Sequence, residues 1–153
     1  MPLALRVESL WKSYIAGVRG CSARVRVLCG LSLTIEYGER VAIVGAAGAG
    51  KSTLAGCILG LRRPDAGVVD APALVTGDLA IVGASRFLAP PDARRIAAAS
   101  MLLFVPEWTF HRSWFDRILL LRDGQLHRLD DEEPVRRVAE RLTAAGGGGS
   151  PRR

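Results

Sequence analysis

The stretch that most constrains the fold is "RVAIVGAAGAGKSTLAG", residues 40–56. The run from Val41 to Val44 is wholly apolar, which is typical of a strand buried on both faces of a parallel sheet. A glycine-rich loop follows it. The apolar pattern from about Lys51 to Leu61 then predicts a helix that stops before "RRPDAG" at 62–67, where proline and glycine cannot continue it. A buried strand, a glycine loop and a helix in this order predict an α/β fold.

The loop matches the pattern G-x-x-x-x-G-K-[ST] in the strand and helix setting that this pattern needs. Glycines let backbone amides converge on phosphate oxygens, and the positive end of the helix dipole points at the same anion. Lys51 would reach the β- and γ-phosphates, and the Ser52 hydroxyl would bind Mg²⁺. The alternative is a glycine turn with a chance Gly-Lys-Ser. We therefore predict a site for ATP and Mg²⁺ in a P-loop NTPase core, formed by Gly45, Gly48, Ala49, Gly50, Lys51, Ser52 and Thr53.

The remaining patterns predict one domain over residues 1–145 with a flexible Gly/Arg tail at 146–153. Near-alternating runs at 3–10 and 25–35 predict an N-terminal antiparallel strand layer, closed by a turn in "IEYGE". Apolar runs at 79–84, 101–105 and 117–129 predict a mainly parallel sheet, with a hairpin at Asp123-Gly124. Helices are expected in "DARRIAAAS" (92–100) and in the amphipathic segment 133–145.

Composition narrows the class of protein. The net charge is +6, but the arginines are scattered and not interleaved with aromatic residues, so we expect no nucleic-acid partner. Cys21, Cys29 and Cys57 are odd in number and form no CxxC pair, which argues against a disulfide framework and a zinc site and favours a cytoplasmic setting. No leader pattern and no apolar run of membrane-spanning length is found.

The segments "VESLWKSY" and "VLCGLSLTIEYGERVAIVGAAGAGKSTLAGCILGLRRPDAG" resemble the N-terminal half of an ATP-binding cassette (ABC) transporter ATPase. The resemblance implies that Tyr14 stacks on adenine, whereas periodicity alone makes Tyr14 an ordinary edge-strand aromatic. It also implies a transporter membrane subunit or a second ATPase chain as partner, and a location at the inner face of the membrane. The extra segment 15–26 is similar to that of cassettes from polysaccharide exporters.

Beyond Gly67 the sequence departs from the family pattern. Only residues 68–78 separate Gly67 from the next apolar run, so the helical subdomain, the glutamine loop and the Ser-Gly-Gly signature are absent. If 79–84 is the Walker B strand, the Mg²⁺-binding aspartate is replaced by Gly83 and the catalytic glutamate by Ala84. Alternatives stay open for three other residues. Asp78 or Glu107 would hold Mg²⁺ through water, but the favoured interpretation is that Asp78 caps a turn and Glu107 is solvated. His111 would take the place of the switch histidine that Glu107 replaces, but a position on a short helix face is favoured.

The sequence therefore predicts an ATP-binding subunit of the ABC type with weak or no hydrolysis, and it assigns no catalytic residue. Removing a general base alone typically costs about 10²- to 10⁴-fold in rate. Two other functions compete with this prediction. One is an active small P-loop kinase, with a lid drawn from Arg86, Arg94 and Arg95. The other is a non-catalytic regulatory partner in which the loop is a relic.

Overall fold

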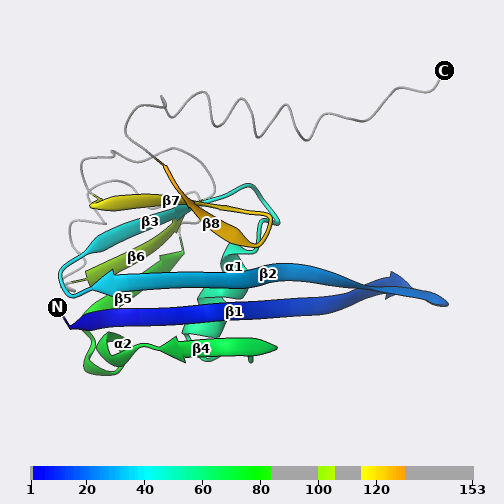
Figure 1. The fold of residues 1–153 in the computed structure, drawn as a ribbon, viewed down its shortest axis with the longest axis horizontal. Coiled ribbons are helices and arrows are strands. Elements are labelled where there is room, and N and C mark those ends of the chain that lie inside the picture. Colours follow the sequence, from blue (N-terminus) through cyan, green and yellow to red (C-terminus); the bar gives the residue numbers. More distant parts are fainter. Residues whose placement is uncertain (1, 84–99, 106–114, 130–153) are drawn as a thin grey trace, which may run out of the picture.

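The computed structural model describes residues 2–83, 100–105 and 115–129. It contains two sheets (Figure 1). The first is antiparallel with the strand order β2-β1-β4, and the second is mainly parallel with the order β5-β6-β3-β7-β8. The antiparallel sheet is built from β1 (Leu3–Val18), β2 (Cys21–Glu36) and β4 (Ala66–Asp70), and the second sheet from β3 (Arg40–Val44), β5 (Leu79–Gly83), β6 (Ser100–Val105), β7 (Arg117–Arg122) and β8 (Gln125–Arg128).

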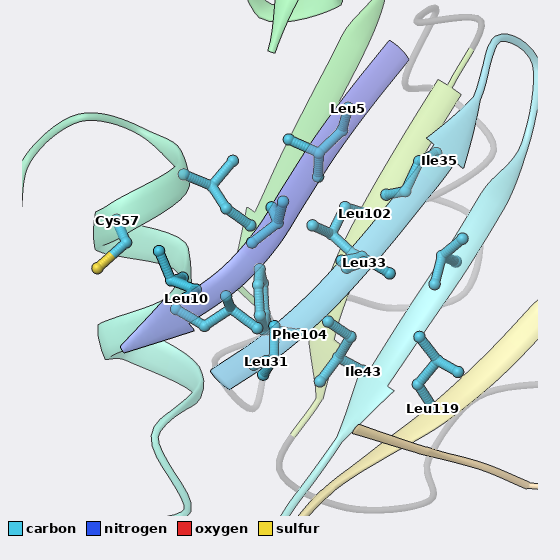
Figure 2. Close-up of a cluster of buried hydrophobic side chains, with 14 of the residues drawn as sticks. Leu5, Leu10, Leu31, Leu33, Ile35, Ile43, Cys57, Leu102, Phe104 and Leu119 are labelled. Atoms are coloured by element: carbon cyan, nitrogen blue, oxygen red, sulfur yellow. The ribbon is translucent and has the colours of Figure 1, made fainter. Parts of the chain in front are cut away.

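The hydrophobic core lies between the two sheets. In β2, Leu31, Leu33 and Ile35 are buried while the residues between them are exposed, as expected for a strand with one face in water. Strand β3 is buried along its whole apolar run, because it lies between β6 and β7 inside the second sheet. Figure 2 shows the resulting contact layer, in which side chains from β1, β2, β3, β6, β7 and α1 meet.

The N-terminal antiparallel layer is confirmed, but its strands are much longer than predicted. The segment 15–26 continues both strands as a hairpin that turns at Arg19-Gly20, with Val18 paired to Cys21. The parallel sheet and the Asp123-Gly124 hairpin are also confirmed. Both turn residues have positive φ, of 52° and 72°, which is the geometry of a two-residue hairpin turn.

The first helix, α1, spans Lys51–Ile58 and is shorter than the predicted 51–61. Its end is set by Gly60 at φ 72°, which lets the Leu61 amide donate to the Gly56 carbonyl at 2.9 Å. A left-handed glycine of this kind closes a helix before any proline is needed. The prediction that Pro64 and Gly67 stop the helix was therefore wrong.

The link between Gly67 and β5 contains β4 and the short helix α2 (Pro72–Thr76), which the sequence patterns did not predict. Strand β4 pairs with β1, and Ala73 of α2 is fully buried. Between Gly67 and β5 the described residues form only β4 and α2, and the predicted absence of a helical subdomain from the chain stays a prediction. The expected helix at 92–100 lies outside the described residues except for Ser100, which is instead the first residue of β6. The expected helix at 133–145 and the tail at 146–153 lie outside the described residues, and the single domain over 1–145 stays a prediction.

Candidate phosphate-binding site

The predicted loop leaves the carboxyl end of β3 and enters α1. At three of its positions the surroundings or the backbone conformation require glycine. A Cβ on Gly45 would lie 3.0 Å from the Leu121 carbonyl oxygen of β7. Gly48 and Gly50 have φ of 80° and 106°, a backbone region that L-residues rarely adopt. The loop therefore depends on glycine where it passes β7 and where it turns back toward the helix.

The amides around the start of α1 are available to an anion. Gly50 is the N-cap residue, no side chain caps the helix, and its first turn carries no acidic residue. Within the described part of the chain, the amides of Gly48 and of residues 50–53 donate to no protein acceptor. Such amides, together with the helix dipole, are the features by which a helix N-terminus binds phosphate.

Lys51 lies with its ammonium group inside the loop. Its Nζ donates to the Ala46 carbonyl at 2.8 Å and also to the Gly45 carbonyl. Burial lowers the pKa of the Lys51 ammonium from its ordinary value, because the charged form loses part of its hydration. A phosphate oxygen at this position would restore a full counter-charge to the ammonium.

Ser52 and Thr53 differ in their surroundings. Ser52 is exposed, so its hydroxyl is free to meet a metal ion, whereas Thr53 is buried. The Thr53 Oγ1 lies 3.4 Å from the hydroxyl of Tyr14, which connects α1 to β1. Among the described residues no group of three or more His, Cys, Asp or Glu side chains could hold a metal ion without help from a ligand.

Tyr14 carries more contacts than sequence patterns suggested. The Arg62 guanidinium donates to its hydroxyl at 3.2 Å, and the Arg62 Cζ and Lys12 Nζ lie 5.9 and 5.4 Å from the ring centroid. Tyr14 pairs with Val25 beyond the last residue that β4 contacts, so its strand is locally at an edge. Arg62 and Lys12 were missed because no motif marks them. The stacking role of Tyr14 stays a prediction.

Asp78 lies at the opposite end of the parallel strands from the loop, so its carboxylate cannot reach a metal ion bound there. It immediately precedes β5, whereas the loop follows β3, and these strands point the same way because each runs parallel to β6. Its carboxylate instead accepts a hydrogen bond from Thr76 Oγ1 at 2.6 Å. The alternative that Asp78 holds Mg²⁺ at the loop was therefore wrong.

Gly83 lies at the opposite end of β5, paired with Phe104, and so at the same sheet edge as the loop. A glycine supplies no carboxylate at the place where the sequence comparison expected one. The other substituted or rival residues, Ala84, Glu107 and His111, lie outside the described part of the chain, as do the lid arginines of the kinase alternative.

Comparison with known proteins agrees with this geometry. The family described as "ABC transporter" matches residues 28–85, which include the whole loop. The chain is 46% identical over 65 residues to the lipoprotein-releasing system ATP-binding protein LolD of Syntrophotalea carbinolica, a match that covers 42% of this chain and 27% of the relative. This part of the chain is therefore similar to the ABC transporter ATPases.

Other ABC relatives serve different cargoes. A nickel import ATP-binding protein of Brucella suis is 52% identical over 50 residues, covering 33% of this chain and 19% of the relative. A cytochrome c biogenesis ATP-binding export protein of Gluconobacter oxydans is 48% identical over 64 residues, covering 42% and 28%. The chain thus spans about a quarter of the length of the curated relatives it matches. The hint of a polysaccharide exporter is not supported, because these relatives are lipoprotein, nickel and cytochrome systems.

Solved ABC cassettes share the fold. A cassette in its ADP conformation superposes with a TM-score of 0.68 at 13% identity, covering 97% of this chain and 100% of that chain. A nucleotide-free cassette gives 0.64 at 15% identity, with the same coverage. The predicted α/β P-loop fold is confirmed. Among the described residues, no helix is long and apolar enough to cross a membrane.

Proposed function

We propose that this chain is the nucleotide-binding part of an ABC transporter ATP-binding subunit, which binds MgATP through residues 45–53 and hydrolyses it slowly or not at all. The observation that carries the proposal is the loop itself. Amides without a protein acceptor surround an N-terminal helix end, and Lys51 is the ammonium group that lies inside it. This arrangement supplies positive charge and hydrogen-bond donors together, which is what a polyphosphate requires.

Each residue has a distinct part in holding the ligand. The amides of Gly48 and Gly50 and those at the start of α1 would donate to phosphate oxygens. The Lys51 ammonium would exchange its loop carbonyls for phosphate oxygens, gaining charged partners for neutral ones. The exposed Ser52 hydroxyl would contribute one oxygen to Mg²⁺, which neutralises charge on the β- and γ-phosphates when bound.

Tyr14 fits an adenine contact because it is tied to α1 through Thr53 and stands next to the loop. Its ring already has the cationic groups of Lys12 and Arg62 nearby. Stacking of a base on the ring would have to displace one cation from its face, or use the other face. Base contacts would therefore add less affinity here than on a bare aromatic ring.

The proposal of weak hydrolysis is supported by the absence of a carboxylate at Gly83. Phosphoryl transfer to water needs the attacking water to be positioned and the developing charge to be neutralised. Gly83 brings no carboxylate to the loop edge of the sheet, so Mg²⁺ would depend on Ser52 and the phosphates. The partner of the chain would be a membrane subunit or a second ATPase chain at the cytoplasmic face of the membrane.

The matched region does not select cargo. Proteins named for lipoprotein release, nickel import and cytochrome c biogenesis share it, although their cargoes differ chemically. We therefore assign nucleotide binding to this region. The membrane subunits of a lipoprotein-releasing system are the first partners to test, because the ATP-binding protein of that system recurs among the relatives.

The experiment is calorimetric titration of MgATP into the full chain, with phosphate release followed in the same sample. Lys51→Ala should abolish binding, while Arg122→Ala, which removes an exposed cation on β7, should leave it unchanged. Circular dichroism checks that both variants are folded. Equal affinity in wild type and Lys51→Ala would refute the site, and rapid phosphate release that depends on Lys51 would refute the weak hydrolysis.

A further inference from the structure

The β1-β2 hairpin extends past the rest of the antiparallel sheet. Strand β4 pairs with β1 only as far as Trp11, whereas β1 and β2 stay paired from Ser13 with Arg26 to Val18 with Cys21. We call residues 13–26 the hairpin tip. Figure 1 shows it projecting away from both sheets as a two-stranded ribbon. A two-stranded ribbon has no hydrophobic core of its own, so exposed apolar side chains on it indicate contact with another surface.

Apolar side chains are exposed on both faces of the hairpin tip. Val18 is 85% exposed and Val25 is 47% exposed; Val25 is paired with Tyr14 and so shares its face. Ile15 is 76% exposed and follows Tyr14 directly, so it lies on the opposite face. A flat protein surface would cover one face of the ribbon and leave the apolar side chains of the other face in water. Exposed apolar groups on both faces instead fit surroundings that enclose the ribbon end.

The charge of the hairpin tip is entirely positive. No Asp or Glu occurs between Glu8 and Glu36. Arg19, Arg24 and Arg26 are exposed and have no ion-pair partner among the described residues. Lys12, just before the tip, is excluded from this set because it pairs with Asp65 at 3.4 Å. The three arginines are therefore free for an anionic surface.

We propose that the hairpin tip binds the surface of a bilayer that contains anionic lipid. Ile15 and Val18, which are the most exposed apolar side chains of the tip, enter the boundary between headgroups and acyl chains, and the arginines contact lipid phosphates. The depth is limited, because the ribbon edges carry backbone amides and carbonyls that must stay hydrated. A nucleic acid would neutralise the arginines but would leave the apolar side chains in water. The proposal is independent of nucleotide binding.

The test is flotation of the full chain with vesicles of phosphatidylcholine alone or mixed with phosphatidylserine. We expect binding to the mixed vesicles that weakens with salt. Replacing Arg24 and Arg26 by Gln should reduce partitioning of the protein onto the mixed vesicles about 25-fold, because each cation near the surface contributes roughly fivefold. Ile15→Ser with Val18→Ser should reduce it by about tenfold or more. Matched controls are Val75→Ser, at an 89% exposed residue of α2, and Arg128→Gln on β8.

A second readout locates the contact on the chain. Cys21 is exposed at the end of the hairpin tip, whereas Cys29 is half-buried and Cys57 is buried, so in a Cys29→Ser variant a polarity-sensitive dye at limiting concentration labels Cys21. Its emission should shift to the blue on mixed vesicles. Equal partitioning of the hairpin variants and the controls would overturn the proposal. So would the absence of vesicle binding, or binding to duplex DNA that vesicles do not compete with. MgATP affinity should be unchanged in all hairpin variants.

Discussion

Gly50→Ala should destabilise the fold more than Gly48→Ala, although both changes add the same methyl group to the same loop. Both glycines have positive φ, of 106° and 80°. A Cβ on Gly50 would lie 2.8 Å from Val27 Cγ1 of β2, whereas a Cβ on Gly48 would have no neighbour within 4 Å. Gly48→Ala is therefore a matched control for backbone strain, and the difference between the two variants reports the contact with Val27.

The magnitudes follow from these geometries. The left-handed backbone costs alanine about 1–2 kcal/mol. A more restricted unfolded chain returns about 0.4–1 kcal/mol in both variants. Overpacking adds about 1–3 kcal/mol for Gly50→Ala alone, because β-branched Val27 has little rotamer freedom to move away. We expect a loss of about 1 kcal/mol for Gly48→Ala and about 2–4 kcal/mol for Gly50→Ala.

Urea unfolding followed by circular dichroism measures both free energies of unfolding. Val27→Ala in the Gly50→Ala background completes a double-mutant cycle, and its coupling term should recover the overpacking energy. Equal losses for Gly48→Ala and Gly50→Ala, or a coupling energy near zero, would show that β2 does not press on the loop, which would refute this account of why residue 50 is glycine.

Three further predictions follow. Leu102→Ala, at a fully buried residue of β6, should lower the free energy of unfolding by about 2–5 kcal/mol, and an unchanged urea midpoint would contradict its place in the core. Nucleotide affinity should fall as pH rises through the lowered pKa of Lys51, because only the ammonium binds phosphate. Calorimetric titrations at increasing pH test this, and an affinity that stays constant up to the pKa range of an ordinary lysine would contradict it. Asp65→Asn should lower the melting temperature near neutral pH. The hydrogen bond from Ser13 lowers the Asp65 pKa, so the stabilisation that Asp65 contributes is present above the ordinary Asp pKa and is lost as pH falls through the folded value. The melting temperatures of wild type and variant should therefore converge in acid. A difference in melting temperature that stays constant with pH would be inconsistent with this.

The elements with strong local signals were predictable from sequence. Four successive buried apolar residues before a glycine loop gave β3, and Asp123-Gly124 gave the β7-β8 hairpin. Strand β4 had no such signal. It is mostly exposed, and it exists as a strand because β1 pairs with it, a contact between segments distant in sequence. Pairing of this kind leaves little trace in a local hydrophobic pattern.

The candidate site was predictable where a motif describes it and not where tertiary contacts complete it. The motif gave the loop residues and Lys51; the loop joins β3 to α1, the Lys51 ammonium donates to loop carbonyls, and the binding roles of these residues stay predictions. It could not reveal that Arg62 donates to Tyr14, because that contact depends on the turn which closes α1 at Gly60. Asp78 was misplaced for a related reason, since only the strand directions show which end of β5 faces the loop.

The loop is held from two sheets at once. Val27 of β2 meets the position of Gly50, while its carbonyl oxygen lies 3.0 Å from where a Cβ on Gly124 would stand. Two residues further along β2, the Cys29 amide donates to the Gly124 carbonyl at 3.0 Å. The phosphate loop and the β7-β8 turn therefore share one supporting segment, residues 27–29 of the antiparallel sheet. Displacing residues 27–29 of β2 would disturb both, so this part of the strand supports the candidate site, whereas the hairpin tip at 13–26 lies outside it.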